Sequence, residues 1–200
     1  MRVLMLALLL TVGVGNYANA CADSKTSNVE VDAVHQIGGC AFQMENVDGG
    51  KLDVDNDRKY GSYLVGYGSD TTSWGVQMFC ESLRPGLLED AAGISQQGNG
   101  YVLSNQAEQF IPEQHVKLIR LASKNWTGGG TLTDSTTGEP FDRFRRFHFC
   151  LVHRDQALCG WSDVVPHLSN PSKSSLGEVL KLIKSVEFVD DWIPTSVVPH

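Results

Sequence analysis

The sequence predicts an α+β domain, in which a mostly antiparallel sheet is followed by a C-terminal helix packed on it and a short final strand. From Gly38 onward, short runs of apolar and β-branched residues are separated by clusters of Gly, Asn, Asp and Ser, a pattern typical of strands joined by turns. Near the end, apolar residues recur at the spacing of one helix face: Leu176, Val179, Leu180 and Ile183. Val186 and Phe188 then alternate with polar neighbours, as in a strand. A helix that follows several antiparallel strands buries its apolar face on their sheet.

The individual elements follow from the same patterns. Strands are expected at 40–46, 60–67, 74–81, 115–123, 131–133, 144–152 and 157–164, with 60–67 and 74–81 forming a pair. Residues 47–59 are predicted to be a turn-rich, charged connection. Short helices are expected at 85–92, with Pro85 near the first turn, and at 105–110, where Pro112 stops the helix. Ser175 and Glu178 are spaced as a capping box at the start of the last helix.

The first twenty residues have the order of a secretory signal peptide. Arg2 gives a positive start, residues 3–14 are apolar, and Ala18-Asn19-Ala20 matches a small-x-small cleavage site. The apolar run is shorter than the stretch of about 20 residues that crosses a membrane, and no later segment is long enough. We therefore predict a signal peptide at 1–20, a flexible lead-in at 21–37 and one globular domain at 38–200. The mature chain is expected to be exported to the periplasm or secreted, without a transmembrane span.

The charge balance favours some partners over others. The full sequence has 16 basic and 23 acidic residues, a formal net charge of −7, and the predicted cleavage removes one arginine to give −8. Such a surface repels phosphate backbones, so nucleic acid is not an expected partner. The same charge suits either solubility or a basic protein partner. No cofactor is expected.

Five cysteines in an exported chain predict disulfides, with one cysteine left over. A two-residue turn at Arg154-Asp155 would place these residues opposite one another: Cys150 and Cys159, Arg146 and Asp163, His148 and Trp161, Phe144 and Val165, Leu151 and Leu158, and Phe149 and Gly160. In this register, 150 and 159 form a non-hydrogen-bonded pair, whose Cα atoms approach to about 4.5 Å, within the range that disulfides span. A longer or bulged turn would shift the register and remove the match.

A Cys150–Cys159 bridge leaves Cys40 to pair with Cys80. Cys21 is then the odd cysteine, and it would be the first residue after cleavage. Its position raises the possibility of lipidation and a membrane anchor. Ala18 and Asn19 fit ordinary cleavage better than a lipoprotein signal, so both outcomes stay open, with cleavage alone favoured.

Several apparent chemical motifs have simpler interpretations. The spacing of Asp53, Asp55 and Asp57 resembles the start of a calcium loop, but Arg58 and Leu64 stand where an EF-hand needs Gly and Glu, so we predict a solvated acidic turn. His148 and His153 flank the hairpin cysteines, yet their spacing puts them on opposite sides of a strand, which disfavours a metal or a Cys–His pair. Residues 128–130 are three glycines without the lysine of a phosphate-binding loop, and a flexible turn before a strand is expected.

The closing part of the chain, comprising residues 147–152, 159–161 and 180–189, resembles the ends of small exported bacterial proteins. Some of these are immunity proteins that neutralise toxins directed at the periplasm. The resemblance implies a non-catalytic exported binding protein whose partner is a protein, most concretely a basic toxin blocked by occlusion. Candidate partner-binding residues are Asp53, Asp55, Asp57, Arg146, His148 and Trp161.

Two other functions remain open at this stage. The first is an exported hydrolase with a dispersed active site, which requires His, Asp or Ser side chains to converge in a pocket. The second is an envelope accessory protein or a secreted effector. The sequence contains neither the Gly-x-Ser-x-Gly nor the His-Glu-x-x-His motif that would point to a particular hydrolase class.

Overall fold

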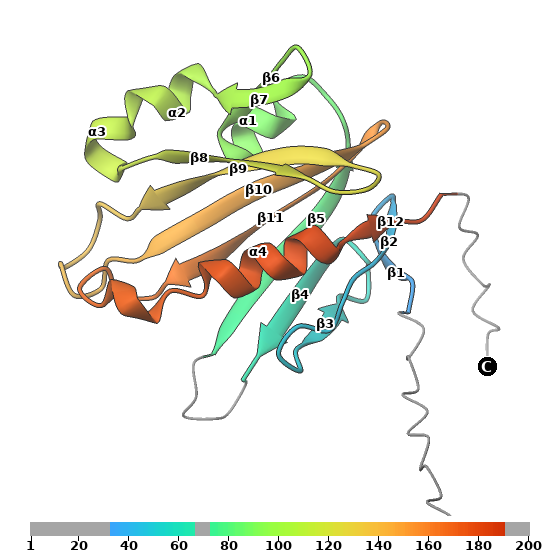
Figure 1. Cartoon of the computed structure of the whole chain (residues 1–200), viewed down its shortest axis with the longest axis horizontal. Helices are drawn as coiled ribbons and strands as arrows, with labels where there is room; N and C mark the ends of the chain where they lie inside the picture. The colour runs from blue at the N-terminus through green and yellow to red at the C-terminus, as the bar shows by residue number, and fades with distance from the viewer. Residues whose placement is uncertain (1–32, 67–72, 191–200) are drawn as a thin grey trace, which may run out of the picture. The chain divides into compact units, whose positions relative to one another are not determined.

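A seven-stranded antiparallel sheet lies at the centre of the structure (Figure 1). The computed structural model describes residues 33–66 and 73–190, so the predicted signal peptide, Cys21 and most of the lead-in lie outside the described residues. The predicted α+β class, with its antiparallel sheet, C-terminal helix and short final strand, is confirmed. In spatial order the strands are β3 (Lys51–Val54), β4 (Tyr60–Val65), β5 (Trp74–Ser82), β11 (Gln156–Val165), β10 (Arg145–His153), β9 (Thr127–Asp134) and β8 (Lys117–Ala122).

One face of this sheet carries the main hydrophobic core. It is covered by helix α4 (Leu176–Ser185) and by a small sheet of β1 (His35–Ile37), β2 (Cys40–Gln43) and β12 (Glu187–Phe188). Figure 1 shows α4 crossing the strands, and the helix contacts β11. Strand β1 lies inside the segment 21–37 that was expected to be flexible, so the ordered part begins earlier than Gly38. The core side chains of the central strands and α4 include Phe147, Phe149, Leu151, Val179, Leu182 and Ile183.

The predicted capping box at the start of α4 is wrong. The Ser175 side chain makes no cap hydrogen bond, because it is buried and turned toward the sheet, where its hydroxyl lies 3.5 Å from the Val164 carbonyl oxygen. The first amide of the helix, on Leu176, is instead 3.3 Å from the hydroxyl oxygen of Ser174. Helix α4 is therefore held by its buried apolar face and not by the predicted cap.

Strand β12 and the residue before it are held by side chains from the loop before β9. The Asn125 amide nitrogen donates to the Phe188 carbonyl at 2.7 Å, and its oxygen accepts from the Phe188 amide at 3.3 Å. The buried indole of Trp126 donates to the Val186 carbonyl at 2.6 Å. On the edge of β12 that does not pair with β2, Asn125 therefore supplies the two hydrogen bonds that a second neighbouring strand would supply.

The opposite face is covered only in part. Helix α1 (Leu87–Ala92) contacts β9, β10 and β11, and the hairpin β6 (Ile94–Gln97)–β7 (Gly100–Leu103) lies beside β8 and β9. Helices α2 (Asn105–Gln109) and α3 (Ile111–Gln114) follow, and a 3-10 turn, η1 (Pro171–Lys173), precedes α4. Figure 1 shows α1, α2, α3 and this hairpin gathered at the β8 side of the sheet. A second apolar cluster lies beneath them, formed by Leu87, Leu88, Ala92, Ile94, Tyr101, Cys150, Ala157 and Cys159.

The predicted hairpin register is confirmed over its central part. Cys150 lies opposite Cys159, and the pairs of Arg146, His148, Phe149 and Leu151 also match the prediction. The pairing of Phe144 with Val165 is wrong, because a register shift between Arg145 and Arg146 places Arg145 opposite Val165. The turn forms at residues 154–155, with Arg154 in the left-handed region at a φ of 54°.

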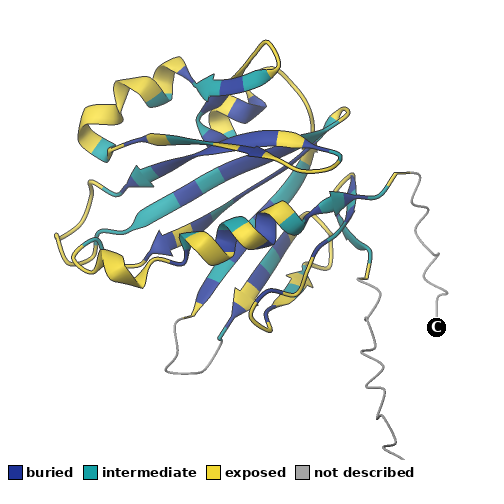
Figure 2. Cartoon of the chain, viewed as in Figure 1, coloured by how far each residue is buried: buried dark blue, intermediate teal, exposed yellow. Residues whose placement is uncertain are grey.

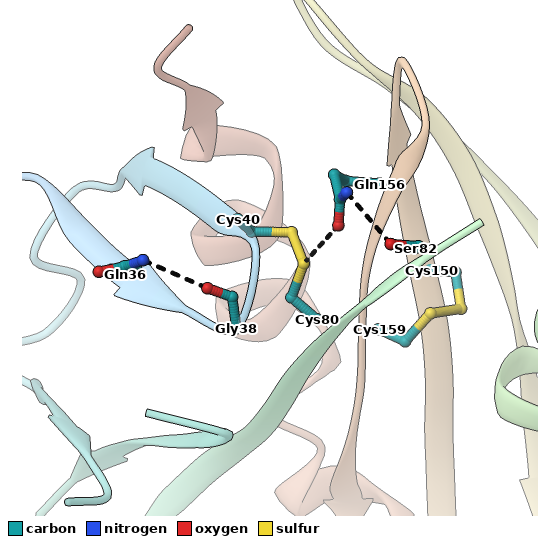
Figure 3. The surroundings of a disulfide bond; sticks show 8 residues. All are labelled: Gln36, Gly38, Cys40, Cys80, Ser82, Cys150, Gln156 and Cys159. Carbon is teal, nitrogen blue, oxygen red and sulfur yellow. Dashed lines mark hydrogen bonds between the residues drawn. A yellow bond between two sulfur atoms is a disulfide. The ribbon is translucent and has the colours of Figure 1, made fainter. Parts of the chain in front are cut away.

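Both predicted disulfides are present. Cys150 and Cys159 join β10 to β11 with Cα atoms 4.0 Å apart. Cys40 and Cys80 join β2 to β5 with Cα atoms 5.9 Å apart (Figure 3). The first bridge lies on the partly covered face, and the second connects the small sheet to the large one. Two disulfides are compatible with an oxidising compartment.

The glycine run at 128–130 is not a turn, as the sequence suggested, but part of strand β9. A Cβ atom on Gly128 would clash with the carbonyl oxygen of Cys150, and one on Gly130 would clash with that of His148. The glycines are therefore required by the close approach of β9 to β10, and not by a need for turn conformations.

Three other elements differ from the prediction. Strand β3 lies within 47–59, which was expected to be a connection, and the β6–β7 hairpin was not predicted. Helix α2 ends before Pro112, as predicted, but a new helix, α3, begins at Ile111 and holds Pro112 in its first turn, where proline needs no amide hydrogen bond. The predicted pairing of the strands at 60–67 and 74–81 is confirmed as β4 and β5.

Candidate functional site

A single row of side chains runs across the sheet on its partly covered face. Strand pairing places Asp53 opposite Ser62, Ser62 opposite Gln77, and Gln77 opposite Trp161. Trp161 in turn lies opposite His148, and His148 opposite Thr131. Directly opposite residues of neighbouring strands point to the same face, so these six side chains share one surface. Three of the residues predicted from the sequence, Asp53, His148 and Trp161, are thus brought into one line.

The row is covered at one end and open at the other. Thr131 is buried beneath α1, whereas Trp161, Gln77 and Ser62 are partly exposed and Asp53 is exposed. Figure 2 shows the mixture of buried and exposed positions along the strands. We call the uncovered part of this surface the open face, and it comprises Lys51, Asp53, Tyr60, Ser62, Leu64, Gln77, Phe79, Arg146, His148, Trp161 and Asp163.

The open face has an apolar component. Tyr60 is 54% exposed and Leu64 is 39% exposed, although both lie on β4, which is paired on both sides within the sheet. The Tyr60 ring also lies 6.4 Å from that of Phe79 on β5. Exposed aromatic and aliphatic side chains surrounded by polar groups are typical of surfaces that contact another molecule.

Arg146 is held in place on the open face. Its guanidinium donates two hydrogen bonds to Asp163, at 2.6 and 3.1 Å, and lies 4.8 Å from the ring centroid of Phe144. The predicted opposition of Arg146 and Asp163 is thus an ion pair, and both side chains remain partly exposed. A guanidinium fixed by a carboxylate and a ring loses little freedom when a partner binds it.

His148 has a different character. Burial lowers the pKa of its imidazole, the nearby Arg146 charge lowers it further, and Asp163 opposes the shift. The ring therefore favours the neutral form. Among the described residues it makes no hydrogen bond with another side chain or with the backbone. One ring nitrogen is then free to donate and the other to accept.

The three aspartates of the acidic turn do not form one group. Asp53 belongs to β3 and to the open face, whereas Asp55 accepts hydrogen bonds from the amides of Lys59 and Tyr60, at 2.6 and 3.2 Å. Asp57 is exposed in the turn between β3 and β4. Within 33–66 and 73–190, no three His, Cys, Asp or Glu side chains are grouped as a metal would require.

Two histidines outside the predicted site bind aspartates. His115 lies 3.0 Å from Asp134, which also accepts two hydrogen bonds from Arg145 at 2.5 and 2.9 Å. Burial raises the pKa of the Asp134 carboxyl, but the hydrogen bonds and charges of Arg145 and His115 outweigh this effect and lower it. This group lies at the ends of β9 and β10 and holds them together.

The second histidine is His153, at the end of β10. It lies between the Asn125 carbonyl oxygen, at 2.6 Å, and the Asp190 carboxylate, at 2.7 Å, and it stacks on the Phe188 ring. The hydrogen bond from His153 lowers the pKa of Asp190, and the charge of Arg154 adds to this. Neither His115 nor His153 is hydrogen-bonded to a Ser, Thr or Cys side chain of the described residues, so neither forms part of a nucleophilic triad there.

A cavity of about 480 Å³ lies at the covered end of the row. His148, Thr131 and Thr133 line it from the sheet, and residues of α1, α2 and α3 line it from above. No sequence pattern predicted this cavity, because it depends on how three short helices pack on the sheet. Helices α2 and α3 are mostly polar and have no apolar face. This pattern is the one local indication that they expose most of their surface.

The chain matches no known protein-family model, and a comparison with curated proteins finds no match either. None of the helices in the described part of the chain is long and apolar enough to cross a membrane.

Proposed function

We propose that the protein is an exported, non-catalytic binding protein that captures a protein partner on its open face. The most concrete form of this proposal is an immunity protein that neutralises a basic secreted toxin by covering it. The observation that carries the proposal is the continuous row from Asp53 through Ser62 and Gln77 to Trp161, on a sheet surface that no other element of the described chain covers. His148 lies next in the row, at the border of the covered end.

The residue types on this face support protein binding. Binding energy in protein interfaces is concentrated in Trp, Tyr and Arg, and Trp161, Tyr60 and Arg146 all lie here. Asp53 at the margin and the net charge of the chain favour approach of a basic partner. A secreted effector or envelope accessory protein would use the same face for a different partner, and the neighbouring genes would distinguish these cases.

The alternative of an exported hydrolase rests on one observation. Burial lowers the pKa of His148, which lines a cavity that Glu89 and Asp90 also line. An imidazole that favours the neutral form can accept a proton. This function predicts hydrolysis of an ester, amide or glycoside substrate by the mature chain, with activity lost in His148→Gln.

The first test of the binding function is affinity capture of the mature chain from a lysate of its own source under non-reducing conditions, with bound proteins identified by mass. We expect one stoichiometric basic protein, whose activity is lost in the complex. Trp161→Ala should weaken its binding about 30-fold or more, as expected for a central aromatic residue. Unchanged affinity in this variant would remove the open face as the binding surface.

Charge reversal tests the steering role of the acidic margin. Asp53→Lys and Asp57→Lys should slow association and make it less sensitive to salt, because they remove attraction to a basic partner. Asp55 is left unchanged, since its carboxylate holds the turn. The matched control is Glu178→Lys on α4, which makes the same charge change on the opposite face. An equal effect of Glu178→Lys would indicate net charge alone and not this surface.

A further inference from the structure

The cavity at the covered end of the row contains hydrogen-bonding groups without partners. Four uncharged polar side chains reach it from four different elements or their ends, and none of them is hydrogen-bonded to another described residue: Gln106, Gln114, Thr133 and His148. The other hydroxyls there are engaged, since Thr131 donates to the Ala92 carbonyl at 2.9 Å and Ser104 accepts from the Ala107 amide at 3.1 Å. The unpartnered groups are therefore free to bind a ligand.

The charges around the cavity disfavour ionic ligands. No Lys or Arg of the described residues lines it, so a phosphate or carboxylate would find no counter-charge from them. Its two carboxylates already have neighbours. Glu89 accepts from the Ser95 hydroxyl at 2.7 Å, and Asp90 lies 3.7 Å from the Arg84 guanidinium. A cation would have to compete with Arg84, whereas the four free groups can each donate or accept without any charge.

One further side chain limits the chemistry. Phe110, between α2 and α3, lines the cavity and is 37% exposed. A ligand that fits both Phe110 and the free groups needs an apolar surface on one side and hydroxyl or amide groups around its edge. The ring of a sugar has this combination, because its C–H groups form apolar patches and its hydroxyls lie at the rim.

We infer that the cavity between α1, α2, α3 and strands β9 and β10 binds one ring of a neutral saccharide. Gln106, Gln114, Thr133 and His148 hydrogen-bond its hydroxyls, and Phe110 contacts its apolar side. A volume of about 480 Å³ is within the range of small-molecule sites and accommodates a single ring with room for water. This site shares only His148 with the open face, and sugar binding does not depend on capture of a protein partner.

The test is a titration of the ¹⁵N-labelled mature chain, followed by amide chemical shifts. The probes are methyl glucoside and N-acetylglucosamine, with n-butylammonium chloride as a cation. We expect saturable shifts at Gly93, Ala107 and Thr133 with at least one sugar and none there with the cation. Gln106→Ala and Thr133→Val should each weaken sugar binding roughly three- to tenfold, the effect of one lost hydrogen bond.

The matched control is Gln109→Ala, which removes another exposed glutamine of α2 that does not line the cavity. It should bind sugar as the wild type does. The inference is overturned if neither sugar shifts these amides, if only n-butylammonium does, or if Gln106→Ala and Thr133→Val bind sugar unchanged. It is also overturned if Gln106→Ala abolishes capture of the protein partner while no sugar binds, because the cavity would then receive part of that partner. Failure to capture any partner leaves the sugar titration unaffected.

Discussion

The two disulfides should contribute unequally to stability, because they close loops of different length. Their cysteines are 40 residues apart in Cys40–Cys80 and 9 apart in Cys150–Cys159. The chain-entropy relation gives a loss of about 13 cal/mol/K in the unfolded chain for the longer loop and about 8.7 cal/mol/K for the shorter one. At 25 °C these values correspond to about 3.9 and about 2.6 kcal/mol, a difference of about 1.3 kcal/mol.

Each contribution can be measured without the effect of removing sulfur atoms from the structure. In a Cys21→Ser background, the variant Cys150→Ala/Cys159→Ala keeps only the longer bridge, and Cys40→Ala/Cys80→Ala keeps only the shorter one. Urea unfolding of each variant with and without reductant compares a protein with itself, so cavity effects cancel. With an m-value of about 2 kcal/mol/M, reduction should lower the midpoint by about 2 M in the first variant and about 1.3 M in the second.

The order of the two shifts is the decisive result. Equal shifts, or a larger shift for the shorter loop, would refute the loop-length argument. Such a result would mean that the reduced unfolded chain already holds residues 150 and 159 close together, as a hairpin that persists without the bridge would do.

Three other predictions follow from contacts described above. Asp134→Asn should lower the free energy of unfolding by about 1–3 kcal/mol at pH 7 and by less at pH 3. Because the folded-state pKa of Asp134 is lowered, its ion pair stabilises the fold above about pH 4, and this stabilisation is lost as the pH falls through that pKa. Equal urea-unfolding losses at both pH values would contradict this. Gly130→Ala should lower the free energy of unfolding by about 1–3 kcal/mol, because its Cβ atom would clash with the backbone of β10. Gly177→Ala in α4 meets no neighbour and should raise the free energy of unfolding by about 0.5–1 kcal/mol. Thermal unfolding should therefore show a lower midpoint for the first variant and a higher one for the second. Asn125→Ala should cost about 1–3 kcal/mol and speed hydrogen exchange at the Phe188 amide, and unchanged exchange would show that β12 is held elsewhere.

The sequence was most informative where structure is local. The β10–β11 register follows from one short turn, so matching Cys150 to Cys159 also placed Arg146 opposite Asp163. The final helix likewise shows its buried face in its spacing, although Leu182 is buried as well and had not been included. In both cases the decisive contacts lie within a few residues of the turn or within one helix.

Prediction failed where distant parts of the chain decide the outcome. A run of glycines is locally typical of a turn, but Gly128 and Gly130 lie in a strand. Strand β10 lies so close to them that only a residue without a side chain fits. Strand β3 alternates over four residues only, and its neighbours favour turns. The hairpin of β6 and β7 is similarly short and is stabilised by Ile94 and Tyr101 packing on the second cluster.

The candidate site was only partly predictable for the same reason. Three of its residues were selected individually, but their alignment in one row depends on β11 pairing with β5, which no local pattern specifies. Asp55 was selected for its charge, but its carboxylate accepts hydrogen bonds from two amides of the turn between β3 and β4. The cavity beside His148 depends on the placement of three short helices, and no sequence motif corresponds to it.

The strand order also has a consequence for how the chain reaches its native state. Strands β3, β4 and β5 are consecutive neighbours, as are β8, β9, β10 and β11, so the sheet consists of two meanders that meet only where β5 pairs with β11. Neither disulfide crosses this seam, since Cys40–Cys80 joins the small sheet to β5 and Cys150–Cys159 joins β10 to β11. Each half can therefore oxidise correctly before the halves join. Closing the seam pairs residues 74 to 84 apart in the chain, and the pairing of β12 with β2 joins residues 144 to 146 apart. These two long-range steps should limit the folding rate, without requiring any thiol exchange.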